Sequence, residues 1–212
     1  MARYHERFMA NSVRAVIFDY GNVLCEPQQP QDLETLAGLL HMPPEQLRDG
    51  YWRYRAAYDR AELDSKEYWT KVAGAAPSDG VLAKLVEVDT NSWLHPRRAT
   101  LAWVDQVRGN GLRTALLSNL PTPLCDALEN GCSWMPRFDV RTYSCNVGST
   151  KPDRAIYDHC VRELGVRPEE AAFLDDRPEN IEGAARLGIR ALLFESASGA
   201  ADELARMGIP VA

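Results

Sequence analysis

The 212-residue sequence lacks several features that would assign it to other classes of protein. No stretch approaches the roughly 20 apolar residues that a membrane-spanning helix needs. The N-terminal segment MARYHERFMANS carries charges and has no apolar core of signal-peptide length. Repeats and low-complexity tracts are absent. We therefore expect a protein without a membrane span that is located in the cytoplasm.

The sequence also lacks a run of basic residues. The net charge is −6, and acidic and basic residues are interspersed along the chain. A nucleic-acid-binding protein usually carries a basic patch that faces the phosphates. This composition argues against a nucleic-acid partner, and a small anionic substrate would need local positive charge.

Cysteine and histidine show no metal-ligand spacing. The five cysteines are odd in number, which does not suit a disulfide framework, and the four histidines are scattered. We expect reduced thiols, as in a cytoplasmic protein. The cysteines are Cys25, Cys125, Cys132, Cys145 and Cys160.

The most informative segment that is present is VRAVIFDYGNVL, residues 13–24. Its apolar run leads into a single carboxylate, Asp19, and Gly21 follows two positions later. Such a run predicts a buried parallel strand that ends in a tight turn, where open α/β sheets bind their ligands. Asp19 is therefore a candidate nucleophile, although an Asp in this place could simply cap the turn.

Four later segments repeat this design of an apolar strand followed by polar residues. Helical segments alternate with them, which predicts a Rossmann-like parallel sheet with helices on both faces. The strand ends present Asp19, then Ser118 and Asn119, then Lys151, then Asp175 and Asp176. The four segments are Arg113–Leu117, Phe138–Tyr143, Ala171–Leu174 and Ile189–Phe194.

About 85 residues separate the first two strands, far more than one crossover helix requires. Helical spacing and helix-start signals predict four helices there, which we interpret as a small helical cap over residues 27–95 inserted into a core of 1–26 and 96–212. Aromatic and basic residues form a stripe in the second of these helices. Packing is the favoured interpretation of the stripe, and contact of Arg53 or Arg55 with a substrate is the alternative.

Three further helices are expected in the core. They are predicted over Pro96–Arg108, from Lys151 to Leu164, and over Pro178–Leu187, each followed by a glycine-containing stop.

The order and placement of the strand-end residues resemble the haloacid dehalogenase (HAD) superfamily, over Val13–Cys25 and Pro96–Phe194. The resemblance implies that Asp19 is the nucleophile of a phosphatase. It also implies that Ser118 and the backbone amide of Asn119 hold the phosphate, and that Lys151 offsets its negative charge. Taken singly, the Ser-Asn pair is ordinary turn chemistry and most lysines are solvated surface charges.

The paired acids Asp175 and Asp176 predict a cation, because crowded carboxylates raise one another's pKa unless a metal neutralises them. Mg²⁺ suits such a site. The resemblance implies that Asp19, the Gly21 carbonyl and Asp176 bind the ion directly. Asp175 would lie next to these ligands without binding the ion itself. Asn180 would orient a water or Asp176. The alternative for Asp176 is a helix N-cap.

The sequence departs from the family pattern at Gly21, where most related phosphatases carry an aspartate that acts as general acid and base. Sequences with Asp-x-Gly-Asn-Val resemble a subgroup of sugar-phosphate phosphatases and the N-terminal domain of soluble epoxide hydrolase. The proton for the leaving group would come from water, from the cap or not at all, so we expect a strong dependence of rate on the leaving group. We also expect a turn shaped for glycine to accommodate a side chain poorly.

These observations favour a Mg²⁺-dependent phosphatase that hydrolyses a small phosphorylated metabolite through an aspartyl-phosphate on Asp19. A metal-independent 2-haloacid dehalogenase is the first alternative, and the acidic pair Asp175-Asp176 argues against it. A catalytically weak binding or regulatory protein is the second alternative, motivated by Gly21.

Overall fold

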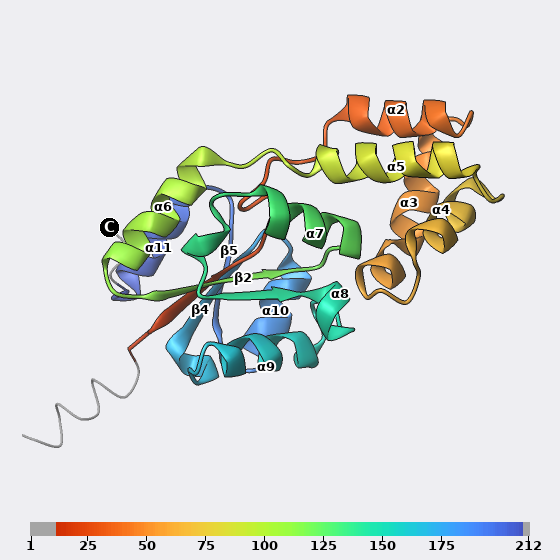
Figure 1. Cartoon of the computed structure of the whole chain (residues 1–212). Coiled ribbons are helices and arrows are strands. Elements are labelled where there is room, and N and C mark those ends of the chain that lie inside the picture. Colours follow the sequence, from red (N-terminus) through yellow and green to blue (C-terminus); the bar gives the residue numbers. More distant parts are fainter. Residues whose placement is uncertain (1–11, 210–212) are drawn as a thin grey trace, which may run out of the picture.

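The computed structural model describes residues 12–209 and has a five-stranded parallel sheet at its centre (Figure 1). The strand order is β3-β2-β1-β4-β5, so that β1 lies in the middle and Asp19 follows it at the carboxyl edge. The Rossmann-like α/β fold predicted from the sequence is confirmed. The strands are β1 (Ala15–Phe18), β2 (Arg113–Ser118), β3 (Val140–Tyr143), β4 (Ala171–Asp175) and β5 (Arg190–Leu193).

Alternate residues of each strand pack against opposite helical layers. In β1, Val16 and Phe18 belong to one buried cluster, whereas Ala15 and Ile17 belong to the other. The first cluster includes side chains from α6 (Arg98–Gly109), α7 (Thr122–Gly131) and α11 (Ala197–Arg206). The second includes side chains from α9 (Arg154–Glu163) and α10 (Pro178–Ala185). Burial on both faces is why β1 reads as a continuous apolar run.

Three short helical segments complete the core. They are η1 (Met135–Arg137), α8 (Ser144–Val147) and η2 (Pro168–Glu170). The sequence analysis did not predict α7, α8 or α11.

The helix predicted from Lys151 begins three residues later, at Arg154. Residues 151–153 form a turn that includes a cis Lys151–Pro152 bond. The late start accompanies a tertiary contact, because the Lys151 carbonyl, which would accept the first hydrogen bond of a helix begun at this residue, accepts from Asn119 Nδ2 at 3.0 Å. The helix predicted from Pro96 likewise begins at Arg98.

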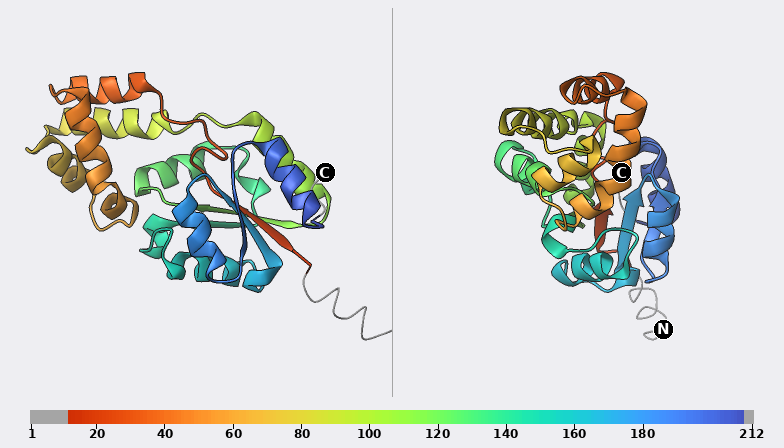
Figure 2. Two further views of the ribbon diagram at one scale, coloured as in Figure 1. Left: turned by 180° about the vertical axis from the view of Figure 1, so that it is seen from behind. Right: turned by 90° about the vertical axis from the view of Figure 1, so that its right-hand side faces the viewer.

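Four helices lie between β1 and α6 and pack on one another beyond the carboxyl edge of the sheet (Figure 2). A capping box starts α4 as the sequence predicts, since Asp64 Oδ1 accepts from Glu67 N–H at 2.8 Å. The aromatic residues of α3 mostly pack, as expected, because Tyr51 and Tyr58 are buried in the cluster that these helices share. The helices are α2 (Pro30–Leu39), α3 (Pro44–Asp59), α4 (Ser65–Ala73) and α5 (Asp79–Ser92).

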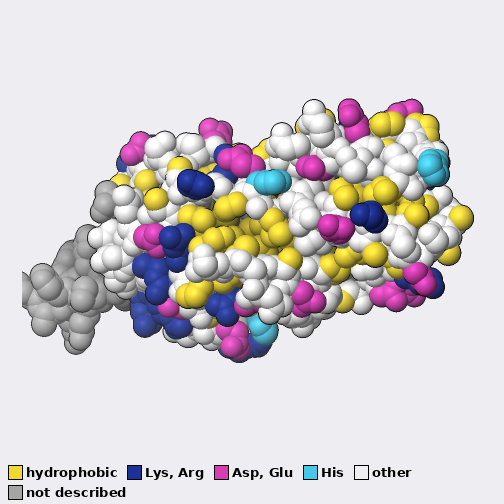
Figure 3. All heavy atoms as spheres, turned by 45° about the horizontal axis from the view of Figure 1, so that its top comes forward, with side chains coloured by type: hydrophobic (Ala, Val, Ile, Leu, Met, Phe, Trp, Pro, Cys, Tyr) yellow, Lys and Arg dark blue, Asp and Glu magenta, His cyan; other side chains and the backbone are white. Residues whose placement is uncertain are grey.

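Within residues 12–209, none of the helices combines the length and apolar character needed to cross a membrane. Figure 3 shows charged side chains of both signs over the face that it presents, with hydrophobic side chains between them. No basic stripe runs the length of that face.

Candidate active site

A cavity of about 670 Å³ opens at the carboxyl edge of the sheet, and it is lined from both sides. The core side supplies the residues that follow β1, β2 and β4 and the turn that contains Lys151. The opposite side supplies α3 and Trp93, which follows α5. The structure therefore brings all the strand-end residues named from the sequence to one cavity, apart from Asp175, which is buried directly behind it.

Asp19 lies at the centre of the site, because β1 is the middle strand. Its backbone N–H donates to the Leu174 carbonyl at 2.9 Å, which continues the β1–β4 pairing to this residue. One carboxylate oxygen, Oδ1, accepts from the Tyr20 N–H at 2.6 Å and lies 2.6 Å from Lys151 Nζ. Among residues 12–209, no donor meets the other oxygen, Oδ2. Asp19 therefore has one oxygen held in place and one available to a ligand.

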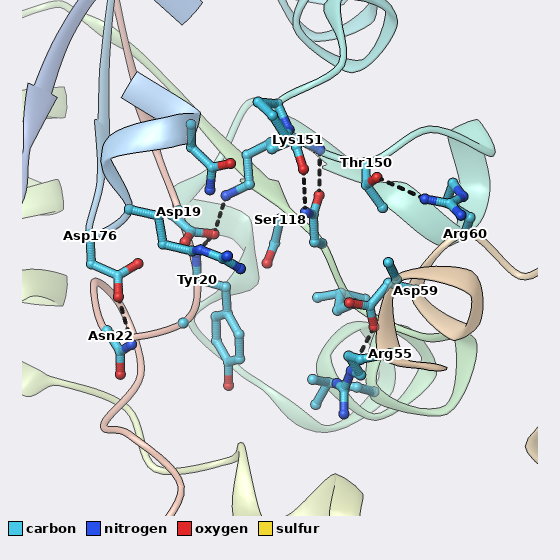
Figure 4. Close-up of a pocket in the computed structure, with 18 of the residues that line it drawn as sticks. Asp19, Tyr20, Asn22, Arg55, Asp59, Arg60, Ser118, Thr150, Lys151 and Asp176 are labelled. Atoms are coloured by element: carbon cyan, nitrogen blue, oxygen red, sulfur yellow. Dashed lines mark hydrogen bonds and ion pairs between the residues drawn. The ribbon is translucent and has the colours of Figure 1, made fainter. Parts of the chain in front are cut away.

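Lys151 is a buried cation that joins two carboxylates, and Figure 4 shows its contact with one of them, Asp19. Its Nζ lies 2.6 Å from Asp19 Oδ1 and 2.6 Å from Asp175 Oδ2, and it donates to the Leu117 carbonyl at 3.1 Å. The residue is only 5% exposed, so it is not a solvated surface lysine. All three ammonium donors have partners, which fixes the charge beside the candidate nucleophile.

The pKa values of this pair reflect burial and the neighbouring charges. Burial raises the pKa of Asp19 to about 7, against the lowering effect of Lys151 and with a further increase from Asp175. For Lys151, burial by itself lowers the pKa, but the carboxylates of Asp19 and Asp175 outweigh that effect and raise it overall. Lys151 thus stays charged, and Asp19 keeps its proton to a higher pH than an exposed aspartate does.

The two neighbouring acids after β4 have different environments. Asp175 is fully buried, and it accepts hydrogen bonds from Lys151 Nζ, from the Arg177 N–H and from the Asn180 side-chain nitrogen. The sequence analysis expected Asn180 to orient a water or Asp176. That expectation is wrong, because Asn180 Nδ2 donates to both oxygens of Asp175, at 2.9 and 3.0 Å.

Asp176 is partly exposed and lines the cavity. Its Oδ2 accepts from Asn22 Nδ2 at 2.7 Å, and no donor from the described part of the chain meets its Oδ1. The alternative role of Asp176 as a helix cap is not seen, since Arg177 occupies the N-cap of α10. Asp176, like Asp19, keeps a free oxygen at the cavity.

The donor set fits a hard cation. Asp19, Asp175 and Asp176 each offer an oxygen, and these atoms lie within 4.8 Å of one another. Asp175 has its oxygens occupied by donors, so the free oxygens are those of Asp19 and Asp176, and Gly21 lines the same cavity. Two carboxylates with room for other oxygen ligands suit Mg²⁺.

Ser118 and Asn119 end β2 beside this site. Ser118 is buried at the cavity wall. The side chain of Asn119 has a role that the sequence analysis missed, because Oδ1 accepts from the Lys151 N–H at 2.8 Å and Nδ2 donates to the Lys151 carbonyl at 3.0 Å. No local pattern signals this pair, since the two residues are 32 positions apart.

The helix α3 contributes residues that the sequence analysis left largely unassigned. Arg55 and Asp59 are buried at the cavity and form an ion pair, with Arg55 Nε 2.8 Å from Asp59 Oδ1. Arg60 also lines the cavity and donates to Thr150 Oγ1 at 3.3 Å. Arg53 is exposed and is not part of the lining.

The expectation that the turn at Gly21 excludes a side chain is wrong. The left-handed conformation belongs to the next residue, Asn22, at φ 58°, and Gly21 has no positive φ. A Cβ at Gly21 would meet only a ring carbon of Trp93, at 3.8 Å, which is an ordinary contact. The backbone at position 21 therefore accepts other residues.

Comparison with known proteins identifies the family. A family model described as a haloacid dehalogenase-like hydrolase matches residues 13–188. The chain belongs to this family.

Among curated proteins, the chain is 38% identical over 113 residues to acyl-CoA dehydrogenase family member 10 of Mus musculus, which is 51% of this chain and 10% of that protein. It is 25% identical over 206 residues to the phosphatase MT3486 of Mycobacterium tuberculosis, covering 92% of this chain and 93% of that protein. The chain spans between about a tenth and about a third of the length of three curated relatives it matches.

A solved structure with the same fold is the HAD family enzyme bt-2542 of Bacteroides thetaiotaomicron, in complex with magnesium and inorganic phosphate. The TM-score is 0.71 at 17% identity, and the match covers 87% of this chain and 95% of that one. At this identity the similarity concerns the fold.

Proposed function

We propose that this hydrolase is a Mg²⁺-dependent phosphatase of a small phosphate ester, with Asp19 as its nucleophile. The observation that carries the proposal is the arrangement around Asp19. Lys151 holds Oδ1 of Asp19 in place. The other oxygen of Asp19, Oδ2, and one oxygen of Asp176, Oδ1, are open to the cavity. Relatives named as phosphatases support a phosphorylated substrate.

Each residue of the site has a role in this proposal. Asp19 attacks phosphorus and forms an aspartyl-phosphate, which water then hydrolyses. The Ser118 hydroxyl and the Asn119 backbone N–H bind phosphoryl oxygens, and Lys151 offsets the negative charge on them.

Asp19, the Gly21 carbonyl and Asp176 would hold the magnesium ion. When bound, Mg²⁺ neutralises the acidic cluster and polarises a phosphoryl oxygen. Asp175 does not bind the ion in this proposal, because it holds Lys151 in place.

We further propose that residues 27–95 act as a cap domain over a core of 1–26 and 96–212. Helices α2–α5 have a hydrophobic cluster of their own, and α3 forms the far wall of the cavity. In this arrangement α3 and Trp93 select the leaving group. The cytoplasmic location expected from the cysteine usage stays a prediction.

The dehalogenase alternative is disfavoured by the charge at the site. A 2-haloacid carries a carboxylate, and the open carboxylates of Asp19 and Asp176 would repel it. The same acids suit a phosphate bound together with a divalent cation.

The test is a screen of phosphate esters, including sugar 1-phosphates and nucleotides, with Mg²⁺ and with EDTA. We expect turnover with Mg²⁺ and none with the chelator, and we expect Asp19→Asn to remove both turnover and any trapped phosphoenzyme. Turnover that survives EDTA would refute the metal assignment. Turnover by Asp19→Asn at a comparable rate would show that water attacks directly. A weak binding protein would bind esters without turning them over.

A further inference from the structure

None of the residues given a role in the proposed phosphatase function can protonate the leaving group. Position 21 is a glycine, and Lys151 has all its donors engaged by Asp19, Asp175 and Leu117. The expelled oxygen of an alcohol is strongly basic, so a positioned acid would speed its departure by about 10²- to 10⁴-fold. An acid for this step would have to come from another part of the cavity wall.

Asp59 has a carboxyl group on the far wall of the same cavity. It is the last residue of α3, it lines the cavity together with Asp19 and Ser118, and it is 6% exposed. One oxygen, Oδ1, accepts from Arg55 Nε at 2.8 Å, and no donor within residues 12–209 meets Oδ2. Figure 4 shows the Asp59 carboxyl group on the wall of the cavity opposite Asp19 and Asp176, between Arg55 and Ser118.

The end of α3, which carries Asp59, is hydrogen-bonded to the core. The Asp59 carbonyl accepts from Ser144 Oγ at 2.6 Å, and the next residue, Arg60, donates to Thr150, which precedes Lys151. These contacts set the position of the carboxyl group relative to the phosphate-binding residues.

The other ionisable groups of the cavity suit this role less well. Asp19 and Asp176 have the free oxygens assigned to the cation, and Asp153 is exposed at the rim. The Tyr20 hydroxyl already donates to the Trp93 carbonyl, and burial raises its pKa far above the usual range.

Burial, against the net effect of the neighbouring charges, favours a proton on Asp59. Burial raises its pKa most strongly, Arg55 lowers it, Asp89 of α5 raises it and Arg60 lowers it. Cys145 of α8 also faces this carboxyl group. The net effect is an increase, so Asp59 keeps its proton to a higher pH than an exposed aspartate does.

We propose that Asp59 is the general acid that replaces the missing side chain at position 21, an inference that rests on the proposed phosphatase function. As Asp19 forms its bond to phosphorus, the ester P–O bond breaks. The electron pair moves to the leaving oxygen, which takes the proton of Asp59. In the second step the Asp59 carboxylate takes a proton from water while the water oxygen attacks the aspartyl-phosphate. Inorganic phosphate leaves, and both aspartates return to their starting states.

The test compares esters whose leaving groups differ in basicity, all with saturating Mg²⁺. The probes are 4-nitrophenyl phosphate, phenyl phosphate and benzyl phosphate, and the measured quantity is kcat/KM. Nitrophenolate needs little protonation, whereas benzyl alkoxide needs it strongly. We expect Asp59→Asn to lose about 10²- to 10⁴-fold on benzyl phosphate and only a few-fold on 4-nitrophenyl phosphate. Asn can still accept from Arg55, which preserves the local packing.

Asp153→Asn is the matched control, because it removes another carboxyl group from the cavity rim. We expect it to leave the ratio between the three esters unchanged. An equal loss on all three esters for Asp59→Asn would overturn the proposal and assign Asp59 a structural role. An unchanged rate on benzyl phosphate would overturn it as well.

The wild-type enzyme provides a measurement that does not depend on any variant. With Asp59 as the acid, log(kcat/KM) changes little with leaving-group pKa, in place of the strong dependence expected from Gly21 alone. A steep negative slope would overturn the proposal. If the wild type hydrolyses none of the esters, the proposed function itself fails. If it hydrolyses them with a steep slope, only the role of Asp59 fails.

Discussion

Asn119 holds the backbone of Lys151 on both sides, accepting from its N–H at 2.8 Å and donating to its carbonyl at 3.0 Å. The two residues follow different strands, β2 and β3, so this contact sets the ammonium group relative to Asp19. Asn119 therefore positions the lysine to which we assign a catalytic role.

Asn119→Ala should therefore lower kcat by about 10- to 100-fold, because a displacement near 1 Å is enough for such a loss. The backbone N–H that we assign to phosphate binding is retained, so KM should change less than kcat. Steady-state kinetics on 4-nitrophenyl phosphate measure both. Asn130→Ala, which removes an exposed amide of α7, is the matched control and should change neither. A change in KM alone would contradict the positioning role.

Lys151→Ala should cost both stability and turnover. It leaves Asp19 and Asp175 buried without their cation, and breaking a buried ion pair costs about 3–5 kcal/mol. Lys151→Arg should restore little activity, because a planar fork replaces a point charge between two carboxylates. Urea unfolding and phosphatase assays test these outcomes. Near-wild-type turnover in Lys151→Arg would show that charge alone suffices at this position.

The two neighbouring acids should separate metal binding from stability. Asp176→Asn should weaken Mg²⁺ binding at a nearly unchanged melting temperature, because Asp176 is partly exposed and has a free oxygen. Asp175→Asn should weaken Mg²⁺ binding less and lower the melting temperature more, because Asp175 is a buried partner of Lys151. Calorimetric titration with Mg²⁺ and thermal unfolding test the pair. The reverse pattern would assign the ion to Asp175.

Gly21→Ala should leave the free energy of unfolding unchanged or increase it by up to about 1 kcal/mol, since the backbone there accepts a side chain. Gly188→Ala is the contrast, because Gly188 has a φ of 92° and Ala should cost at least about 1 kcal/mol there. Chemical denaturation measures both. A large loss for Gly21→Ala would restore the interpretation of a turn that requires glycine.

In protein stripped of divalent cations, the free energy of unfolding should fall as pH rises from about 4 to about 7. The pKa of Asp19 is about 7 in the folded state and 3.8 as its ordinary value. Between these values the folded protein holds more protons than the unfolded chain, so raising the pH favours unfolding.

Mg²⁺ competes with that proton and should bind more tightly as the pH rises through the same interval. Unfolding curves in EDTA at several pH values test the first statement, and Asp19→Asn is the control, in which most of this dependence should be lost and only the smaller part from Asp59 should remain. A slope that persists undiminished in Asp19→Asn would assign it to another group.

The fold could be predicted from the sequence because its signals are local. Strands buried on both faces read as apolar runs, so the segments that become β1, β2 and β4 were recognisable without their neighbours. The residues that match the family pattern were recognisable for the same reason, since Asp19, Ser118 and Asp176 lie at or directly after the ends of their strands. The helix α7 was not predicted, and its N-cap residue, Pro121, makes no side-chain cap. The helix α11 was not predicted either, although Ser196 caps its first turn.

Only the tertiary structure decided which atoms remain free and which are occupied. Asp175 and Asp176 are adjacent in the sequence, yet one is enclosed by Lys151 and Asn180 whereas the other faces the cavity. The side-chain role of Asn119 and the approach of Asp59 to the core depend on contacts between residues 32 and 85 positions apart. Such contacts arise when the chain closes on itself, and the local pattern of either partner carries no sign of the other.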